Sequence, residues 1–356
     1  MKEILYIQAG ELSNYTGTHF WNTQESYLQA DELQVSEIAS NISFSETIDA
    51  EACRGRATLS PRLLLFDRKS NFGTLGKANA LGAIAADEDQ SNLPLWGGHS
   101  VEYRQSPITK SSYHKQLEDE EEVRTTPSKG IGDVRYWSDF NRLYYLPKSL
   151  QQLPDVPDWE TTSLDWNQGQ ELFTRFNEGS ELMEGDLRLL VEECDHMQGI
   201  QLMNDTDTFG GFMSSFLAYF RDEYQKLPSF TFPLLSGALS SKYDWDEVKR
   251  AKRIVNEALY LRTLNELSSL NIPMEHPALW PGSVWASPLN FPSSSIYHQA
   301  AILSAHIETC TLPFRLNPNH QDIASVSALL KWRGTSPFAE LHGIFPLRRL
   351  LISLTS

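Results

Sequence analysis

This chain contains several short apolar runs. Each run ends at a glycine or a polar turn, and apolar residues with helical spacing then follow. Residues 3–9 form such a run, which Gly10 closes, and Phe20, Trp21 and Tyr27 then have helical spacing from Asn14 onward. A second apolar run covers residues 62–67 and ends in a polar turn. Runs without alternation are typical of strands that are buried on both faces of a parallel sheet. The first third of the chain therefore predicts strand–turn–helix units.

The second half of the chain repeats this alternation. The pattern predicts helices over 168–195, from about Gly211 to Tyr224, over 245–270 and over 297–308, and strands over 199–203 and 230–235. Residues 204–210 are predicted to form a polar turn. Strands that alternate with helices at this spacing predict a doubly wound parallel sheet.

Two stretches interrupt the alternation. Residues 87–130 are polar and contain the unbroken acidic run Glu118–Glu122, which predicts a solvated insertion. Proline and serine crowd residues 273–295, which predicts a second long loop. With 356 residues, the chain predicts one large α/β domain and a partial second layer.

Charge and cysteine usage narrow the function classes. The net charge of −16 disfavours a general nucleic-acid surface, because clustered carboxylates cannot replace the counterions of a phosphate backbone. Three widely spaced cysteines fit a reducing compartment. The N-terminus resembles neither a signal peptide nor a transit peptide, and no apolar run reaches the ~20 residues of a membrane helix.

Three segments resemble motifs of binding or catalytic sites, but each motif is incomplete, so we interpret them as ordinary structural segments. Residues 72–78 resemble a P-loop, but Asn71 replaces its first glycine and Ala78 its hydroxyl residue. Cys194 and His196 lack a second pair at zinc-ligand spacing. Residues 98–102 lack the second glycine of a nucleophile elbow.

Several collinear segments resemble tubulin. The opening Ile7–Gly10, followed by Asn14, Gly17, Phe20 and Trp21, resembles the start of tubulin without a gap. Thr16–Asn22 is nearer to the Misato/DML1 family, a divergent branch of tubulin-like proteins. Further segments that match tubulin are Leu65–Asp67, Cys194–Leu202, Arg221–Tyr224 and Asn256–Leu264, whereas Trp137–Asp139 again resembles the Misato/DML1 family rather than tubulin.

This resemblance implies a tubulin-like, Rossmann-like α/β domain with a truncated second domain. The implied division is a tubulin-like segment over 1–86, an acidic insertion over 87–135, the remainder of the tubulin-like domain over 136–310, and the start of an incomplete intermediate domain over 311–356.

The resemblance also marks where a nucleotide would bind. It implies that phosphates would lie against Gly10, Asn14, Asp67, Thr208, Gly210 and Gly211, and that Asn256 and Tyr297 would hold a guanine base. Glu11 replaces a neutral glutamine, so it either recruits Mg²⁺ or marks an empty site, because a carboxylate repels a triphosphate. Residues 204–212 keep two glycines but add Asp205 and Asp207 where an anion needs amides.

The resemblance implies a non-catalytic factor in the partitioning of mitochondria and the inheritance of mitochondrial DNA, in the cytoplasm and on the cytosolic face of mitochondria. No cofactor is expected, and the implied partners are proteins: tubulin, the cytosolic chaperonin or a protein of the mitochondrial outer surface. Two alternatives stay open. One is a divergent GTPase that uses GTP and Mg²⁺, and the other is a cytoskeletal protein that forms polymers.

Overall fold

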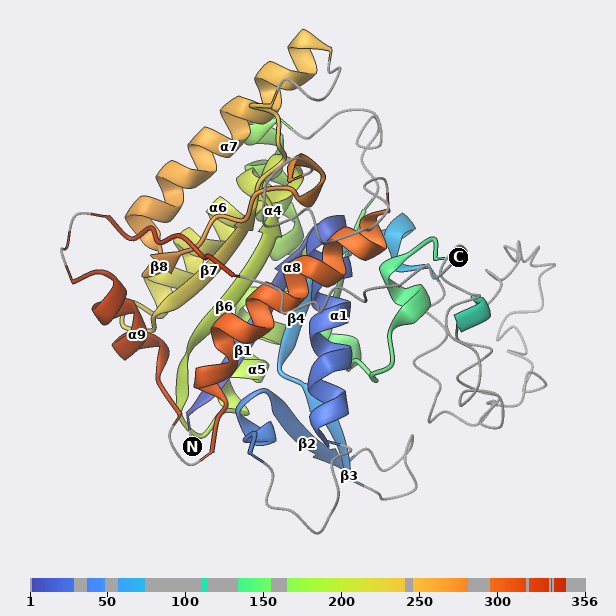
Figure 1. Ribbon diagram of the computed structural model, residues 1–356, viewed down its shortest axis with the longest axis vertical. Helices are drawn as coiled ribbons and strands as arrows, with labels where there is room; N and C mark the ends of the chain where they lie inside the picture. The colour runs from blue at the N-terminus through green and yellow to red at the C-terminus, as the bar shows by residue number, and fades with distance from the viewer. Residues whose placement is uncertain are drawn as a thin grey trace, which may run out of the picture.

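A computed structural model gives the fold of the chain (Figure 1). It describes residues 2–28, 37–48, 57–73, 111–113, 134–154, 165–240, 246–280, 295–317, 320–332, 334 and 336–343. Most of the predicted insertion, the loop over 281–294 and residues 344–356 lie outside these described ranges. Among the described residues, no helix is long and apolar enough to cross a membrane.

Six parallel strands form the central sheet. They are β1 (Glu3–Ala9), β4 (Leu63–Arg68), β5 (Leu150–Leu153), β6 (Met197–Asp205), β7 (Ser229–Leu234) and β8 (Leu270–Asn271). Their spatial order is β5-β4-β1-β6-β7-β8, and every neighbouring pair is parallel. Counted along the chain without the separate hairpin, this is the 3-2-1-4-5-6 order of a doubly wound fold. The predicted fold class is confirmed.

Helices cover both faces of this sheet. One face carries α1 (Glu11–Leu28) and α8 (Ile296–Thr311), and the other carries α4 (Trp166–Ser180), α5 (Arg188–Glu192), α6 (Thr206–Glu223) and α7 (Glu247–Leu267) (Figure 1). Alternate residues of β1 enter the two cores: Ile4 and Tyr6 face α1, whereas Leu5 and Ile7 face α6. Both faces are therefore buried, as the unbroken apolar runs predict.

Smaller elements complete the fold. An antiparallel hairpin pairs β2 (Phe44–Ile48) with β3 (Ala57–Pro61), and α9 (Ile323–Leu330) follows α8. The single-turn helices are η1 (Ser40–Ile42), η2 (Lys69–Phe72), η5 (Trp137–Phe140), η6 (Pro147–Ser149), η7 (Met183–Leu187), η8 (Pro277–Leu279) and η9 (Leu312–Phe314). The segment after α8 packs on the sheet domain, since Phe314 and Ile323 are buried in the core that α1 covers.

Two predicted helices differ in their limits. The predicted turn over 204–210 is wrong, because β6 continues to Asp205 and α6 begins at Thr206. Thr206 and Asp207 suit a first helical turn, where side-chain oxygens and negative charge are favourable. The helix predicted over 168–195 is interrupted at Glu181, which has a φ of 51° and follows Gly179 and Ser180.

Candidate nucleotide-binding edge

The carboxyl ends of the strands bring the predicted phosphate-binding residues to one edge of the sheet. Ala9 at the end of β1 is in register with Phe66 of β4 and with Asn204 of β6. The strand order reverses between β1 and β6, and in open α/β sheets ligands bind at this switch point. Gly10, Asp67 and Asp205 follow these positions directly. This edge is therefore the place to test for a nucleotide site.

The N-terminus of α1 is occupied by a side chain from β6. The backbone amides of Leu12 and Ser13 donate to the two carboxylate oxygens of Asp205, at 3.0 and 2.8 Å. Gly10 makes this approach possible: its φ is +106°, and a Cβ there would lie 2.5 Å from Oδ2 of Asp205. Burial and the nearby Asp207 raise the pKa of Asp205 well above its usual range, whereas the two amides lower it.

Asn14 and Asp67 meet one turn further along α1. The Asn14 amide donates to the Asp67 carboxylate at 2.8 Å and to the Phe66 carbonyl at 3.0 Å. Asp67 also accepts from the Arg68 amide, the Asn71 side chain and the Trp137 indole. Burial raises the pKa of Asp67 to about 6, and the hydrogen bonds limit the rise. Both predicted residues thus hold α1 against β4.

Gly210 and Gly211 lie inside α6 and face other helices. A Cβ on Gly211 would lie 2.4 Å from the carbonyl oxygen of Trp166 in α4, and a Cβ on Gly210 would lie 3.2 Å from Tyr260 in α7. These glycines let the helices approach closely. Thr208 is half-buried in the first turn of α6, and Glu11 is the exposed first residue of α1. Contact of these four residues with a phosphate stays a prediction.

Side chains of α7 complete the edge. Asn256 donates to the Asp207 carbonyl at 3.1 Å, and Arg253 forms an ion pair with the Asp207 carboxylate at 2.8 Å. The buried Glu257 carboxylate accepts from the Thr206 hydroxyl and from the amide and hydroxyl of Ser236. These contacts join the first turn of α6 to α7 and to the segment after β7.

Tyr297 has a different set of neighbours. It lies at the start of α8, where its ring packs against His19 of α1 and Phe140 of η5, with centroids 4.6 and 4.9 Å apart. The neutral His19 ring donates from Nε2 to the Tyr297 carbonyl at 3.0 Å, and burial lowers the pKa of His19 to about 4. The described contacts of Tyr297 and Asn256 therefore do not bring these two residues together.

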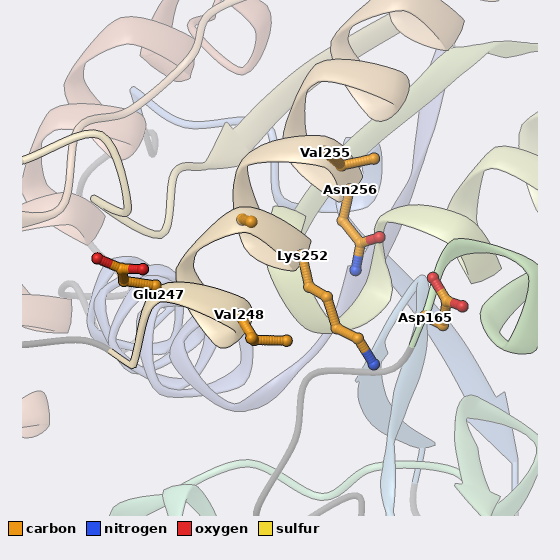
Figure 2. A pocket seen from close by; sticks show the side chains of 7 residues that line it. Asp165, Glu247, Val248, Lys252, Val255 and Asn256 are labelled. Carbon is orange, nitrogen blue, oxygen red and sulfur yellow. The ribbon is translucent and has the colours of Figure 1, made fainter.

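A shallow pocket lies between α7 and the residue that precedes α4. It has a volume of about 420 Å³ and is lined by Asp165, Glu247, Val248, Ala251, Lys252, Val255 and Asn256. Figure 2 shows Asn256 and Lys252 of α7 beside Asp165, which precedes α4. Asn256 is the one predicted nucleotide-binding residue among those that line this pocket. The pocket is therefore separate from the switch point between β1 and β6.

The residues present do not fit the phosphates of a nucleotide. The two amides that would hold an anion are bonded to Asp205, and the neighbouring acids are the buried Asp67 and the part-buried Asp207. No group of three or more metal-ligating side chains occurs within the described ranges. The sequence indicated that Asp205 and Asp207 stand where an anion needs amides. It did not reveal the hydrogen bonds between Asp205 and α1, or the contacts that Arg253 and Glu257 of α7 make with the first turn of α6.

Two family models match the chain. The Misato Segment II tubulin-like domain matches residues 2–119, and the Tubulin domain matches residues 126–316. The second match covers the strands β5, β6, β7 and β8 and the helices between them.

Fungal and animal relatives match over nearly the entire chain. Protein DML1 of Gibberella zeae is 36% identical over 96% of this chain and 67% of its own length. Protein dml1 of Aspergillus clavatus is 36% identical over 90% and 62%, and protein misato homolog 1 of Mus musculus is 28% identical over 98% and 65%. The chain thus spans about two thirds of the length of these relatives. On this similarity, the chain belongs to the Misato/DML1 family of tubulin-like proteins.

Proposed function

We propose that this chain is a non-catalytic, tubulin-like factor that acts through protein contacts in the partitioning of mitochondria and the inheritance of mitochondrial DNA. Family membership supports the tubulin-like part of this proposal. The observation that carries the non-catalytic part is the pair of hydrogen bonds from the α1 amides to Asp205. The protein would work in the cytoplasm and on the cytosolic face of mitochondria.

The electrostatics of the edge support the absence of nucleotide. A triphosphate at the start of α1 would meet Asp205 where it needs amide donors, with Asp67 and Asp207 nearby. Two unit charges of the same sign at 4 Å repel by about 4 kcal/mol at an effective dielectric constant near 20. The chemistry of this edge therefore favours a fold that is stable without GTP.

A nucleotide titration tests the non-catalytic part. Fluorescent GTP with Mg²⁺ is titrated with the purified chain, and tubulin serves as the positive control. We expect no saturable signal from this chain. Saturable, Mg²⁺-dependent binding in the micromolar range would contradict the proposal and favour the divergent GTPase.

Affinity purification from cells tests the protein-binding part. We propose that the partner is tubulin, the cytosolic chaperonin or a protein of the mitochondrial outer surface, and mass spectrometry of the captured proteins separates these three. Depletion of the protein is expected to alter the distribution of mitochondria and the copy number of mitochondrial DNA. Normal mitochondria and normal copy number after depletion would contradict the mitochondrial role.

A further inference from the structure

An anion site at the start of α1 is filled from inside the protein. The first amides of a helix have no acceptor within the helix, and the dipole of the 18-residue α1 favours negative charge there. Asp205 supplies that charge from β6, 192 residues away from Ser13. Each of its two carboxylate oxygens accepts a hydrogen bond from one backbone amide of α1. The Ser13 hydroxyl also donates to the Met203 carbonyl at 2.8 Å, so α1 and β6 are joined at three points.

The fit between Asp205 and the helix is close. Asp205 is 8% exposed, and the absence of a side chain at Gly10 leaves only enough space for the carboxylate. Asp207 does not share this role, because its carboxylate pairs with Arg253. Among these two neighbouring acids, Asp205 is therefore the one that serves α1.

We infer that Asp205 is an internal ligand, whose carboxylate takes the place of an external oxyanion and fastens α1 to the end of β6. The inference rests on the proposed function, in which no nucleotide binds at this edge. It adds that the fold keeps a working anion site and fills that site with its own side chain. Removing the carboxylate should therefore create a binding site for a small carboxylate anion.

Chemical rescue by formate tests this inference, since formate has the size and charge of the missing group. Three variants are compared by urea unfolding at about pH 8, in sodium formate and in sodium chloride of equal ionic strength. D205A removes the carboxylate and leaves space. D205N keeps the space filled with a neutral amide. D207N removes the neighbouring part-buried carboxylate, which pairs with Arg253.

We expect formate to stabilise D205A alone. At a formate concentration about a hundred times its Kd, the ratio of folded to unfolded D205A rises about a hundredfold over the chloride sample. The wild type, D205N and D207N should unfold equally in both salts. Equal unfolding of D205A in formate and chloride would overturn the inference.

A folding failure of D205A does not prevent the test. In that case the yield of refolding from urea is measured in each salt, and the inference requires a higher yield in formate. Equal yields would overturn it. The two proposals can be contradicted separately. GTP binding by the wild type would contradict the proposed function. No response of D205A to formate, in a protein whose wild type does not bind GTP, would contradict the internal ligand alone.

Discussion

Asp67 is a fully buried carboxylate that is held by four donors, two on each oxygen. Oδ1 accepts from the Arg68 amide and the Asn71 side chain, and Oδ2 accepts from Asn14 and Trp137. These donors come from α1, from η5, from η2 and from Arg68 at the end of β4. A single charge therefore connects these parts of the fold, and both of its oxygens must accept.

We expect D67N to lower the free energy of unfolding by about 1–3 kcal/mol at neutral pH. The new NH₂ group cannot accept, so the two donors on one oxygen would lose their acceptor, and an unpaired group costs about 1–3 kcal/mol when it is buried. D139N is the matched control. Asp139 is also fully buried, but its Oδ2 accepts from the Arg135 and Tyr136 amides, and Asn keeps that oxygen while losing only an ion pair with the exposed Arg135 side chain. Equal losses in the two variants, measured by urea unfolding, would contradict this reasoning.

The same comparison has a pH dependence. The pKa of Asp67 is raised to about 6 in the folded protein, above its usual 3.8, so the folded state takes up the proton first as the pH falls. As the pH falls from 7 to 5, protonation of Asp67 therefore raises the free energy of unfolding of the wild type, whereas D67N has no such increase. The difference between the two proteins should widen by about 1 kcal/mol at pH 5.

Residues that the resemblance to tubulin marks were easier to predict than the contacts they make. The resemblance marked Gly10, Asn14 and Asp67, and the fold brings them to one edge of the sheet. The bond between Asp205 and α1 depends on the adjacency of β1 and β6, which lie almost 200 residues apart. No spacing pattern reveals that contact, and the charge of Asp205 alone indicated only repulsion of a nucleotide.

The packing of α6 depends on two glycines. This helix lies between α4 and α7, and Gly211 faces the start of α4 while Gly210 faces Tyr260 of α7. The carbonyl oxygen of Trp166 lies 2.4 Å from the place where a Cβ of Gly211 would stand. Because the atoms nearest to Gly211 are backbone atoms of α4, these two helices would have to separate to accept a side chain there.

We expect G211A to lower the free energy of unfolding by about 1–3 kcal/mol, the usual cost of overpacking. The better helix propensity of alanine offsets part of that cost. G179A is the control: Gly179 is exposed in α4, and a Cβ there would meet nothing within 4 Å. It should gain up to about 1 kcal/mol from helix propensity. A stabilising G211A would show that α4 and α6 do not pack this closely.

Long apolar strands were predicted well, and short or edge strands were not. β1, β4, β6 and β7 are buried on both faces; β1 and β4 have apolar runs, and over residues 199–203 of β6 and in β7 the apolar residues still outnumber the polar ones enough to predict a strand. β5 has only four residues, two of them glutamines, and β8 has two residues at the end of the predicted long helix. The hairpin of β2 and β3 was missed because its polar residues carry no clear alternation. Pairing with a neighbour, rather than local pattern, defines these strands.

Charge over the entire chain governs its response to salt. The net charge is −16 at pH 7, and the exposed ion pairs include local ones such as Glu171–Arg175 and Arg262–Glu266. Exposed pairs of this kind contribute about 0.3–0.5 kcal/mol each, whereas the excess of carboxylates repels itself over the full surface. Repulsion should therefore outweigh attraction at neutral pH.

We expect added sodium chloride to stabilise the protein at pH 7. The Debye length falls from about 30 Å at 0.01 M to about 10 Å at 0.1 M, so repulsion between distant carboxylates is screened first. The urea midpoint should rise over this range. The control is the same titration near the sequence pI of about 5.0, where the net charge vanishes and screening removes only favourable pairs. A midpoint that falls with salt at both pH values would mean that attractive pairs dominate the surface. In that case the excess of carboxylates would be locally neutralised, and its repulsion of nucleic acid and of nucleotide would lose its basis.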